Sequence, residues 1–464
     1  MVATKLRQHC WLFWSASVGI FFLAICRYWI PYVPSDSVPN NIESFRLALN
    51  LAHSGRFADP YLIPSGPSAH MAPAFPFLLS LLVRIFGDGS AGIYAIKLSA
   101  IFVLSLQLAL FPLFAETLGM NASAGFIAAI LWIAAKVGLM VERDHPLGPV
   151  FNWESLYAAL LVSVLLYGCR RWMDDAEDDR VAISWLIGVM VGLLVMTSPT
   201  SVIIFGGWFI WMAYRERHHH FGRTFAVIAL IPSLLTLAWL LRNYLVFDRP
   251  VFVRDNFGLE LSVANNDCAM FGMAQSYDSG CYQKVHPNVS LNEAREVAIY
   301  GEPGYNERKL KSAEVWIAHH PRRFLKLVSL RFLAFWMPPA NGQAYSMFGS
   351  GRRLERTAVQ IMTVLSVPGL LMLFRKDRQS AIVCMVCLAL FPLVYYIVDY
   401  EYRYRYPILW LTFLLGSLPL GKAVERLRST RSQNRNAAKE RDLQTRTGLT
   451  LPVCDQNNAG SALD

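Results

Sequence analysis

Long apolar runs alternate with short polar stretches along most of the chain. A helix needs about 20 mostly apolar residues to cross a bilayer, because each residue adds about 1.5 Å against a hydrocarbon core of about 30 Å. On this criterion we predict about ten membrane-spanning helices, at residues 11–30, 91–115, 125–141, 151–168, 181–196, 200–214, 224–241, 358–374, 381–398 and 408–421. The pattern therefore predicts an all-α integral membrane protein with many spans.

Two further apolar runs, at residues 71–86 and 324–336, are shorter and are interrupted by Arg84 and by Lys326 and Arg331, respectively. Cytoplasmic loops are enriched in Lys and Arg. All basic clusters fall on one side only if both short runs lie flat on the membrane. We therefore predict two amphipathic interfacial helices, with these three basic residues at the polar boundary and both termini in the cytoplasm.

This topology divides the chain into four regions. Residues 1–241 form an N-terminal transmembrane module, whose first outer loop spans residues 31–90. Residues 242–355 form a large outer segment that includes an interfacial helix. Residues 356–421 supply the C-terminal transmembrane helices, and residues 422–464 form a disordered basic cytoplasmic tail, because they are polar and lack aromatic side chains.

The composition agrees with a membrane location. Of the 464 residues, 54% are hydrophobic and only 16% are charged, against about 25% charged in ordinary soluble domains. A net charge of +10 is explained by the basic cytoplasmic loops, so we do not interpret it as a nucleic-acid-binding surface.

Of the eight cysteines, only Cys268 and Cys281 lie in the large outer segment. An oxidising exterior favours a disulfide across this short loop. The alternative is two unpaired thiols.

Ionisable residues gather at the outer boundary, whereas the spans are nearly free of charge, with Lys97 and Lys136 as the main exceptions. Transporters and channels place ionisable groups inside the spans, facing a pathway near the midplane. The opposite distribution indicates an enzyme that works at the membrane surface, on a substrate whose apolar part stays in lipid.

The first outer loop carries the first candidate chemistry. Ile42, Phe45, Leu49 and Ala52 follow helical spacing and predict an amphipathic helix. Asp36 precedes this helix. Further on, residues 65–79 form a stretch punctuated by proline that contains His70 and leads into the first interfacial helix; we take His70 as a substrate-binding candidate.

At these residues the sequence resembles the GT-C superfamily of polytopic glycosyltransferases, which includes protein O-mannosyltransferases and aminoarabinose transferases. The resemblance rests on the pattern L-A-x-x-L-A-x-x-G-x-F from Leu47 to Phe57, followed by P-x-x-P and then F-G. Later segments of the bacterial members are similar to residues 239–260, 320–325 and 401–407, so the resemblance extends through most of the chain.

The resemblance implies an inverting transferase of the plasma (inner) membrane that moves a sugar from a polyprenyl-phosphate carrier to an extracytoplasmic lipid, glycan or protein. It leaves the need for a divalent cation open. An acid in the first outer loop would deprotonate the acceptor hydroxyl or amine. Asn40 and Asn41 occupy the register of the usual acidic pair, and an amide cannot act as a base.

Asp36 and Glu43 are the neighbouring substitutes for that acid. We prefer Asp36 because the base normally precedes the helix; the alternatives are a solvated turn carboxylate at Asp36 and a surface charge at Glu43. A second acid is expected in the next outer loop, where Glu142, Asp144 and Glu154 compete. Glu154 would lie inside the end of a span, where a carboxylate is costly unless it faces a cavity. Asp144 is also a candidate for substrate binding.

For the carrier phosphate we predict Arg242, Arg403 and Arg405, since a guanidinium can donate two hydrogen bonds to a phosphate. The alternative for each is an arginine that extends to lipid headgroups. Two rival functions remain: a flippase for lipid-linked substrates, and a GT-C-like scaffold that has lost catalysis, which Asn40 and Asn41 would explain.

Overall fold

The computed structural model describes residues 42–140, 154–174, 177–215, 222–339 and 351–423, together with residues 426 and 430. The chain forms two compact units, Met1–Leu418 and Pro419–Asp464, and everything below concerns the first. Every regular element in the described ranges is a helix, apart from two isolated β-bridges. The all-α prediction is confirmed.

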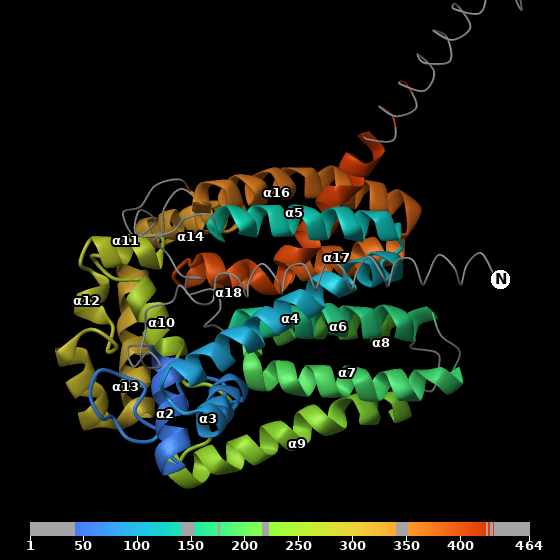
Figure 1. Ribbon diagram of the computed structural model, residues 1–464. Helices are drawn as coiled ribbons and strands as arrows, with labels where there is room; N and C mark the ends of the chain where they lie inside the picture. The colour runs from blue at the N-terminus through green and yellow to red at the C-terminus, as the bar shows by residue number, and fades with distance from the viewer. Residues whose placement is uncertain are drawn as a thin grey trace, which may run out of the picture. The chain divides into compact units, whose positions relative to one another are not determined.

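Long apolar helices and shorter helices build the fold (Figure 1). In chain order they are α2 (Glu43–Ser54), α3 (Ala74–Phe86), α4 (Ser90–Thr117), α5 (Ala122–Met140), α6 (Glu154–Asp174), α7 (Glu177–Thr197), η3 (Pro199–Ser201), α8 (Val202–Arg215), α9 (Gly222–Phe247), α10 (Phe257–Ala264), α11 (Met273–Asp278), α12 (Tyr282–Val285), α13 (Leu291–His319), α14 (Pro321–Trp336), α16 (Gly351–Lys376), α17 (Arg378–Leu390), α18 (Leu393–Ile397) and η4 (Tyr402–Arg405). Residues 406–423 are also helical.

Six stretches of the described residues are long and apolar enough to cross a membrane. They are Ser90–Thr117, Glu154–Asp174, Arg180–Thr197, Thr224–Phe247, Glu355–Lys376 and Arg378–Ile397. Three shorter apolar helices are Ala74–Phe86, Ala122–Ala135 and Pro199–Tyr214. Each predicted span from residue 91 onward is mainly helical in its described residues, whereas residues 11–30, 141 and 151–153 lie outside the described ranges. The protein is therefore a multi-pass membrane protein.

The predicted span at 381–398 is divided into α17 and α18 by a turn at Phe391 and Pro392. Proline has no N–H to continue the helical hydrogen-bond ladder. The interruption places Tyr395 on a separate short helix.

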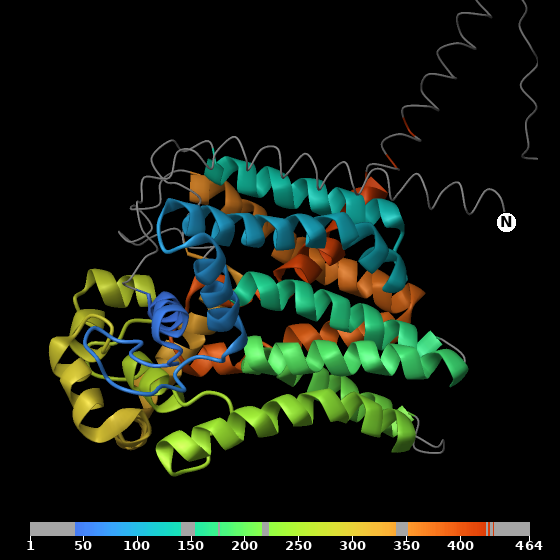
Figure 2. The same ribbon diagram turned by 60° about the horizontal axis from the view of Figure 1, so that its bottom comes forward.

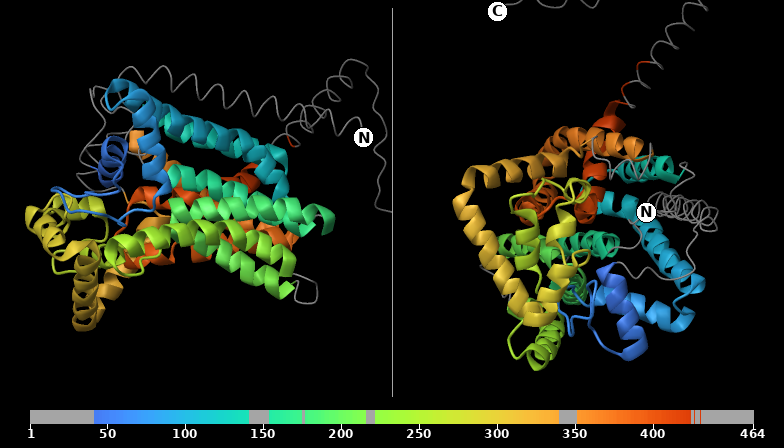
Figure 3. Two further views of the ribbon diagram at one scale, coloured as in Figure 1. Left: turned by 90° about the horizontal axis from the view of Figure 1, so that it is seen from below. Right: turned by 90° about the vertical axis from the view of Figure 1, so that its left-hand side faces the viewer.

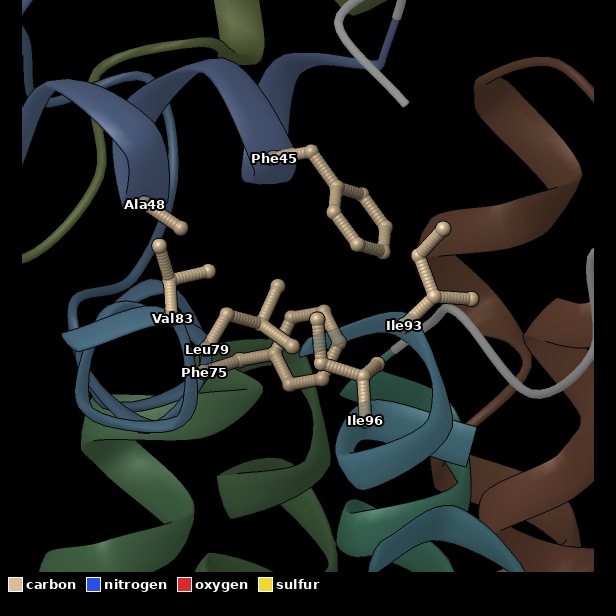
Figure 4. Packing of buried hydrophobic residues seen from close by; sticks show 7 residues of the cluster. All are labelled: Phe45, Ala48, Phe75, Leu79, Val83, Ile93 and Ile96. Atoms are coloured by element: carbon tan, nitrogen blue, oxygen red, sulfur yellow. The ribbon is translucent and has the colours of Figure 1, made fainter. Parts of the chain in front are cut away.

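The predicted amphipathic helix of the first loop is α2, and it packs on α3 and on the start of α4. Phe45 and Ala48 of α2 meet a single apolar cluster that is completed by Phe75, Leu79, Val83, Ile93 and Ile96 (Figure 4). Gly55 ends α2 with a φ of 71°, a conformation that glycine adopts at little cost. The packing positions the first residue of α2, Glu43.

We keep the name outer segment for the residues after α9, which the sequence predicts to lie on the outer side of the membrane. Cys268 and Cys281 form a disulfide with a Cα–Cα distance of 5.5 Å. Helix α13 consists of two parts joined at Gly301, which has a φ of 68° and a non-helical ψ. Helices α10–α13 lie with α2 and α3 at one end of the long apolar helices (Figures 1 and 2), and Figure 3 shows the same end face-on.

The two predicted interfacial runs are α3 and α14, and their basic residues differ. Arg84 and Lys326 are exposed. Arg331 is completely buried, so its predicted place at the polar boundary is wrong. Its guanidinium instead donates to Asn265 Oδ1 and to the carbonyl of Ile397, both at 3.2 Å, and to the carbonyl of Ala264. The two Nη groups of Arg331 thus bond to protein oxygens in the interior.

Candidate functional site

A cavity of about 350 Å³ lies between the ends of the apolar helices and the outer segment. Segments far apart in the sequence build its wall: the start of α2, the loop before α3, the start of α6, the turn after α7, helices α10–α12 and the stretch from α18 to η4. Its polar lining residues are Glu43, His70, Glu154, Ser155, Ser198, Thr200, Arg254, Asn256, Glu260, Tyr282, His286, Asn288, Tyr395, Glu401, Arg403 and Tyr404. This volume suits a small polar ligand group held among convergent side chains.

Glu43 enters the cavity from the first turn of α2. A carboxylate there is favoured by the positive end of the helix dipole. Burial nevertheless raises the pKa of Glu43 to about 7; the charge of Glu260 adds to the rise, whereas a backbone hydrogen bond and Arg403 oppose it. A carboxyl with a pKa near neutrality is suited to proton transfer.

Glu154 is the first residue of α6, and it lines the same cavity. Its Oε2 is buried and accepts no hydrogen bond from any described residue. A buried carboxylate oxygen without a donor is costly, so Glu154 is available to a ligand that carries one.

Two arginines supply the positive charge of the cavity. Arg254 donates from Nε to the carbonyl of His70 at 3.0 Å, and its two Nη groups donate to no described residue. Arg403 forms an ion pair with Glu401 through Nε. Fixing an arginine by Nε directs the outer edge of its guanidinium elsewhere, which suits recognition of a phosphate.

Glu260 completes the set of four cavity glutamates and accepts a hydrogen bond of 3.1 Å from Asn256 Nδ2. Burial raises its pKa, while Arg254 and Arg403 oppose that rise. The cavity thus combines four acids with two arginines, and each arginine lies near an acid.

A buried network anchors the loop that brings His70 into the cavity. Glu302 accepts from Ser68 Oγ at 2.6 Å and from the backbone N–H of Ala69 at 2.5 Å. Arg242 donates to the carbonyls of Ser68, at 2.7 Å, and Phe57, at 3.0 Å. Because Glu302 of the outer segment and Arg242 of α9 both bond to this loop, the conformation of the loop depends on these two side chains.

Glu302 makes the stability of this anchor depend on pH. Burial raises its pKa from 4.5 to about 8. The pKa of the folded state lies above that of the unfolded state. The stability that the carboxyl contributes is therefore fully present at pH values below the unfolded-state pKa of 4.5, and it is lost as pH rises through about 8. We expect Glu302→Gln to melt like wild type near pH 5 and several degrees higher than wild type near pH 9.

Thermal unfolding of detergent-purified protein across that pH range measures this effect. Glu314→Gln, which changes an exposed glutamate of α13, is the matched control and should follow the wild-type profile. A constant difference between Glu302→Gln and wild type at every pH would contradict the assigned ionisation.

The structure brings together four of the residues predicted from sequence: Glu43, Glu154, His70 and Arg403 all line the cavity. Asp36 and Asp144 lie outside the described residues, as do Asn40 and Asn41. Their roles stay predictions.

Arg242 and Arg405 do not line the cavity. Besides holding the loop, Arg242 lies over the rings of Trp239, at 4.9 Å, and Phe57, at 5.6 Å. Arg405 is 1% exposed and donates to the carbonyls of Phe335 and Trp336 at 3.1 and 2.9 Å. In the described residues both guanidiniums bond to protein groups, so phosphate binding by either would require these contacts to break.

Arg254, Glu260, Glu401 and His286 line the cavity but were not among the residues chosen from sequence. The first three lie in the stretches 239–260 and 401–407 that carry the resemblance, where the residues chosen were Arg242, Arg403 and Arg405. His286 has no sequence signal, because it reaches the cavity only through the fold of the outer segment.

Among the residues described, no three His, Cys, Asp or Glu side chains are placed to share a metal ion.

Fold and cavity together define a polytopic membrane protein with a polar cavity at the ends of its apolar helices. No protein-family model matches the sequence, and no curated protein matches it. Solved structures share the fold. One is the archaeal oligosaccharyltransferase AglB from Archaeoglobus fulgidus in complex with an inhibitory peptide and a dolichol-phosphate, with a TM-score of 0.52 and 14% identity over 95% of this chain and 52% of that chain.

A second structure is that of the Archaeoglobus fulgidus oligosaccharyltransferase in complex with Zn and sulfate. It has a TM-score of 0.50 and 15% identity over 88% of this chain and 49% of that chain. The chain thus spans about half the length of both proteins. At this level of identity the similarity shows the fold, and the activity of this chain must be argued from its own cavity.

Proposed function

We propose that the protein is a membrane glycosyltransferase that moves a sugar from a polyprenyl-phosphate carrier to an extracytoplasmic acceptor with inversion at the anomeric carbon. The observation that carries the proposal is that one cavity, at the end of apolar helices, holds the carboxyls of Glu43 and Glu154 beside Arg254 and Arg403. A similar fold in a complex with a dolichol-phosphate and a peptide supports a lipid-linked donor and a separate acceptor.

In the proposed reaction, Glu43 removes the proton from the acceptor hydroxyl or amine. The freed electron pair forms a bond to the anomeric carbon while the bond from that carbon to the phosphate oxygen breaks. Polyprenyl phosphate departs with the electron pair of the broken bond, and attack from the opposite face inverts the configuration. The base makes a weak nucleophile reactive, and the cations stabilise the charge that develops on the leaving phosphate.

Arg254 and Arg403 are the proposed phosphate partners, because their guanidiniums line the cavity. Glu154 accepts a donor group of the sugar or of the acceptor with its unpartnered Oε2. The isoprenoid lies along the apolar helices in lipid. We place the cavity on the outer face of the membrane, in agreement with the distribution of Lys and Arg.

The pH dependence of the reaction follows from Glu43. A base must be deprotonated to act, and the pKa of Glu43 is about 7. We expect kcat/KM to rise about tenfold per pH unit below that value and to level off above it. Initial rates between pH 5 and 9 measure this, with binding of the donor followed in parallel; a rate that falls as pH rises from 5 to 7 would exclude a carboxylate base with this pKa.

The direct test is to give purified protein, in lipid nanodiscs, radiolabelled polyprenyl-phosphate sugars together with envelope lipids, glycans and peptides. Consumption of donor with release of polyprenyl phosphate and labelling of an acceptor supports the proposal. In protein reconstituted into vesicles, movement of intact donor across the vesicle membrane without its consumption would identify a flippase. Donor binding with neither consumption nor movement would identify a scaffold.

A further inference from the structure

His286 combines deep burial with a fixed tautomer. It lines the cavity, yet only 3% of its surface is exposed. The backbone N–H of Asn288 donates to its Nδ1 at 3.1 Å. Nδ1 is therefore an acceptor, and the proton of the neutral ring resides on Nε2. The ring stacks on Tyr282 with centroids 4.6 Å apart, which restricts its orientation.

The surroundings keep this ring neutral. Burial lowers the pKa of His286 to about 3, so the Nε2–H persists as a neutral donor through the physiological range. Arg46 Nη1 donates to Asn288 Oδ1 at 2.8 Å and steadies the turn that supplies the Nδ1 contact. The side chain is thus a donor whose direction and protonation state are both set before any ligand arrives.

The Nε2–H of His286 finds no acceptor among the described residues, although four glutamates line the same cavity. Close by, His70 has its pKa lowered by burial and by the neighbouring Arg254 and His286. Arg254 is held through Nε on the carbonyl of His70, and its Nη groups also lack a described acceptor. His286 and Arg254 thus both lie near His70 in the same cavity, and each has N–H groups without an acceptor among the described residues.

We propose that His286 binds a phosphate oxygen of the lipid-linked donor through its Nε2–H, beside the guanidinium of Arg254. A phosphate group bears only acceptor oxygens and an anionic charge, which matches one neutral and one cationic donor. A sugar hydroxyl also carries a hydrogen that needs an acceptor, and, being neutral, it would be stabilised less by the charge of Arg254. The inference rests on the proposed function, since it assumes that the donor is a lipid phosphate.

A matched pair of substitutions separates ligand binding from structure. Gln at position 286 places an amide N–H near the position of Nε2. Asn at that position places its amide near Nδ1, where it can still accept from the N–H of Asn288, but it cannot reach the position of Nε2. A phosphate contact through Nε2 requires His286→Gln to retain binding and His286→Asn to lose it.

The measurement is equilibrium binding of undecaprenyl phosphate and of undecaprenol to wild type and to both variants in nanodiscs. We expect His286→Gln to bind the phosphate within about threefold of wild type and His286→Asn to bind it about 10–100-fold more weakly, as for one hydrogen bond to a charged group. Undecaprenol binding should be equal in all three proteins. His320→Gln, at an exposed histidine of the same segment, should bind both ligands like wild type.

Wild-type affinity of His286→Asn for undecaprenyl phosphate would overturn the inference, as would an equal loss for undecaprenol, which would indicate a structural role. If wild type does not distinguish the phosphate from the alcohol, the proposed function fails as well, so the two failures are distinguishable. Competition with inorganic phosphate and with phosphatidylglycerol identifies the source of the bound phosphate group. If either competitor displaces labelled undecaprenyl phosphate as well as unlabelled undecaprenyl phosphate does, the lipid-linked donor is excluded as the ligand.

Discussion

Glutamine in place of Glu43 is expected to lower kcat for sugar transfer by about 10²–10⁴-fold, the usual contribution of a positioned general base. The amide has nearly the same shape as the carboxylate, but it cannot take a proton from the acceptor. Because Glu43 starts α2 with its carboxyl in the cavity, the substitution leaves the buried face of α2 intact. Donor binding should therefore change little while turnover is lost.

Three comparisons make this test decisive. Glu296→Gln, at an exposed position of α13, should keep full activity. Asp36→Asn tests the residue that the chain order favours as the base, and Glu154→Gln tests the second cavity acid. Full activity of Glu43→Gln together with loss in Asp36→Asn would move the role of base to the residue before the helix.

Replacing Arg331 by methionine is expected to destabilise the folded protein by about 3–5 kcal/mol, the typical effect of leaving a buried charge uncompensated. The side chain is completely buried and bonds to groups from α10 and α18. Its charge also offsets that of Asp399, which is 1% exposed and whose two carboxylate oxygens accept no hydrogen bond from any described residue. Methionine would leave this acid without a counterion.

Thermal or denaturant unfolding in one detergent measures this loss, and Lys326→Met on the same helix is the control. Lys326 is exposed, so its substitution should change stability by less than about 0.5 kcal/mol. Burial already raises the pKa of Asp399 to about 7. The loss of stability in Arg331→Met should therefore grow as pH rises above 7. Adding Asp399→Asn should restore part of the stability. No recovery in the double variant would show that the charge of Asp399 is not the cause of the loss.

The same pair shows where sequence reasoning is limited. Lys326 and Arg331 lie five residues apart on one short apolar helix, and a pattern of apolar and basic positions treats them alike. Their surroundings differ because α10 and α18 cover only Arg331. Arg242 and Arg405 are similar cases: their places at the ends of predicted spans suggested a phosphate ligand, whereas the fold supplies carbonyls that accept from them.

The order of apolar and polar residues by itself determined the helical class and the places where the chain can cross a membrane, because these depend on length and local composition. It also brought the acids Glu43 and Glu154 into consideration. Only the tertiary structure decided which charged groups share a cavity and which are satisfied by protein carbonyls, since Arg254, His286 and Arg403 come from segments that are distant along the chain. Burial and the proximity of charges, which raise the pKa of Glu43 and keep His286 neutral, exist only once those segments have packed together.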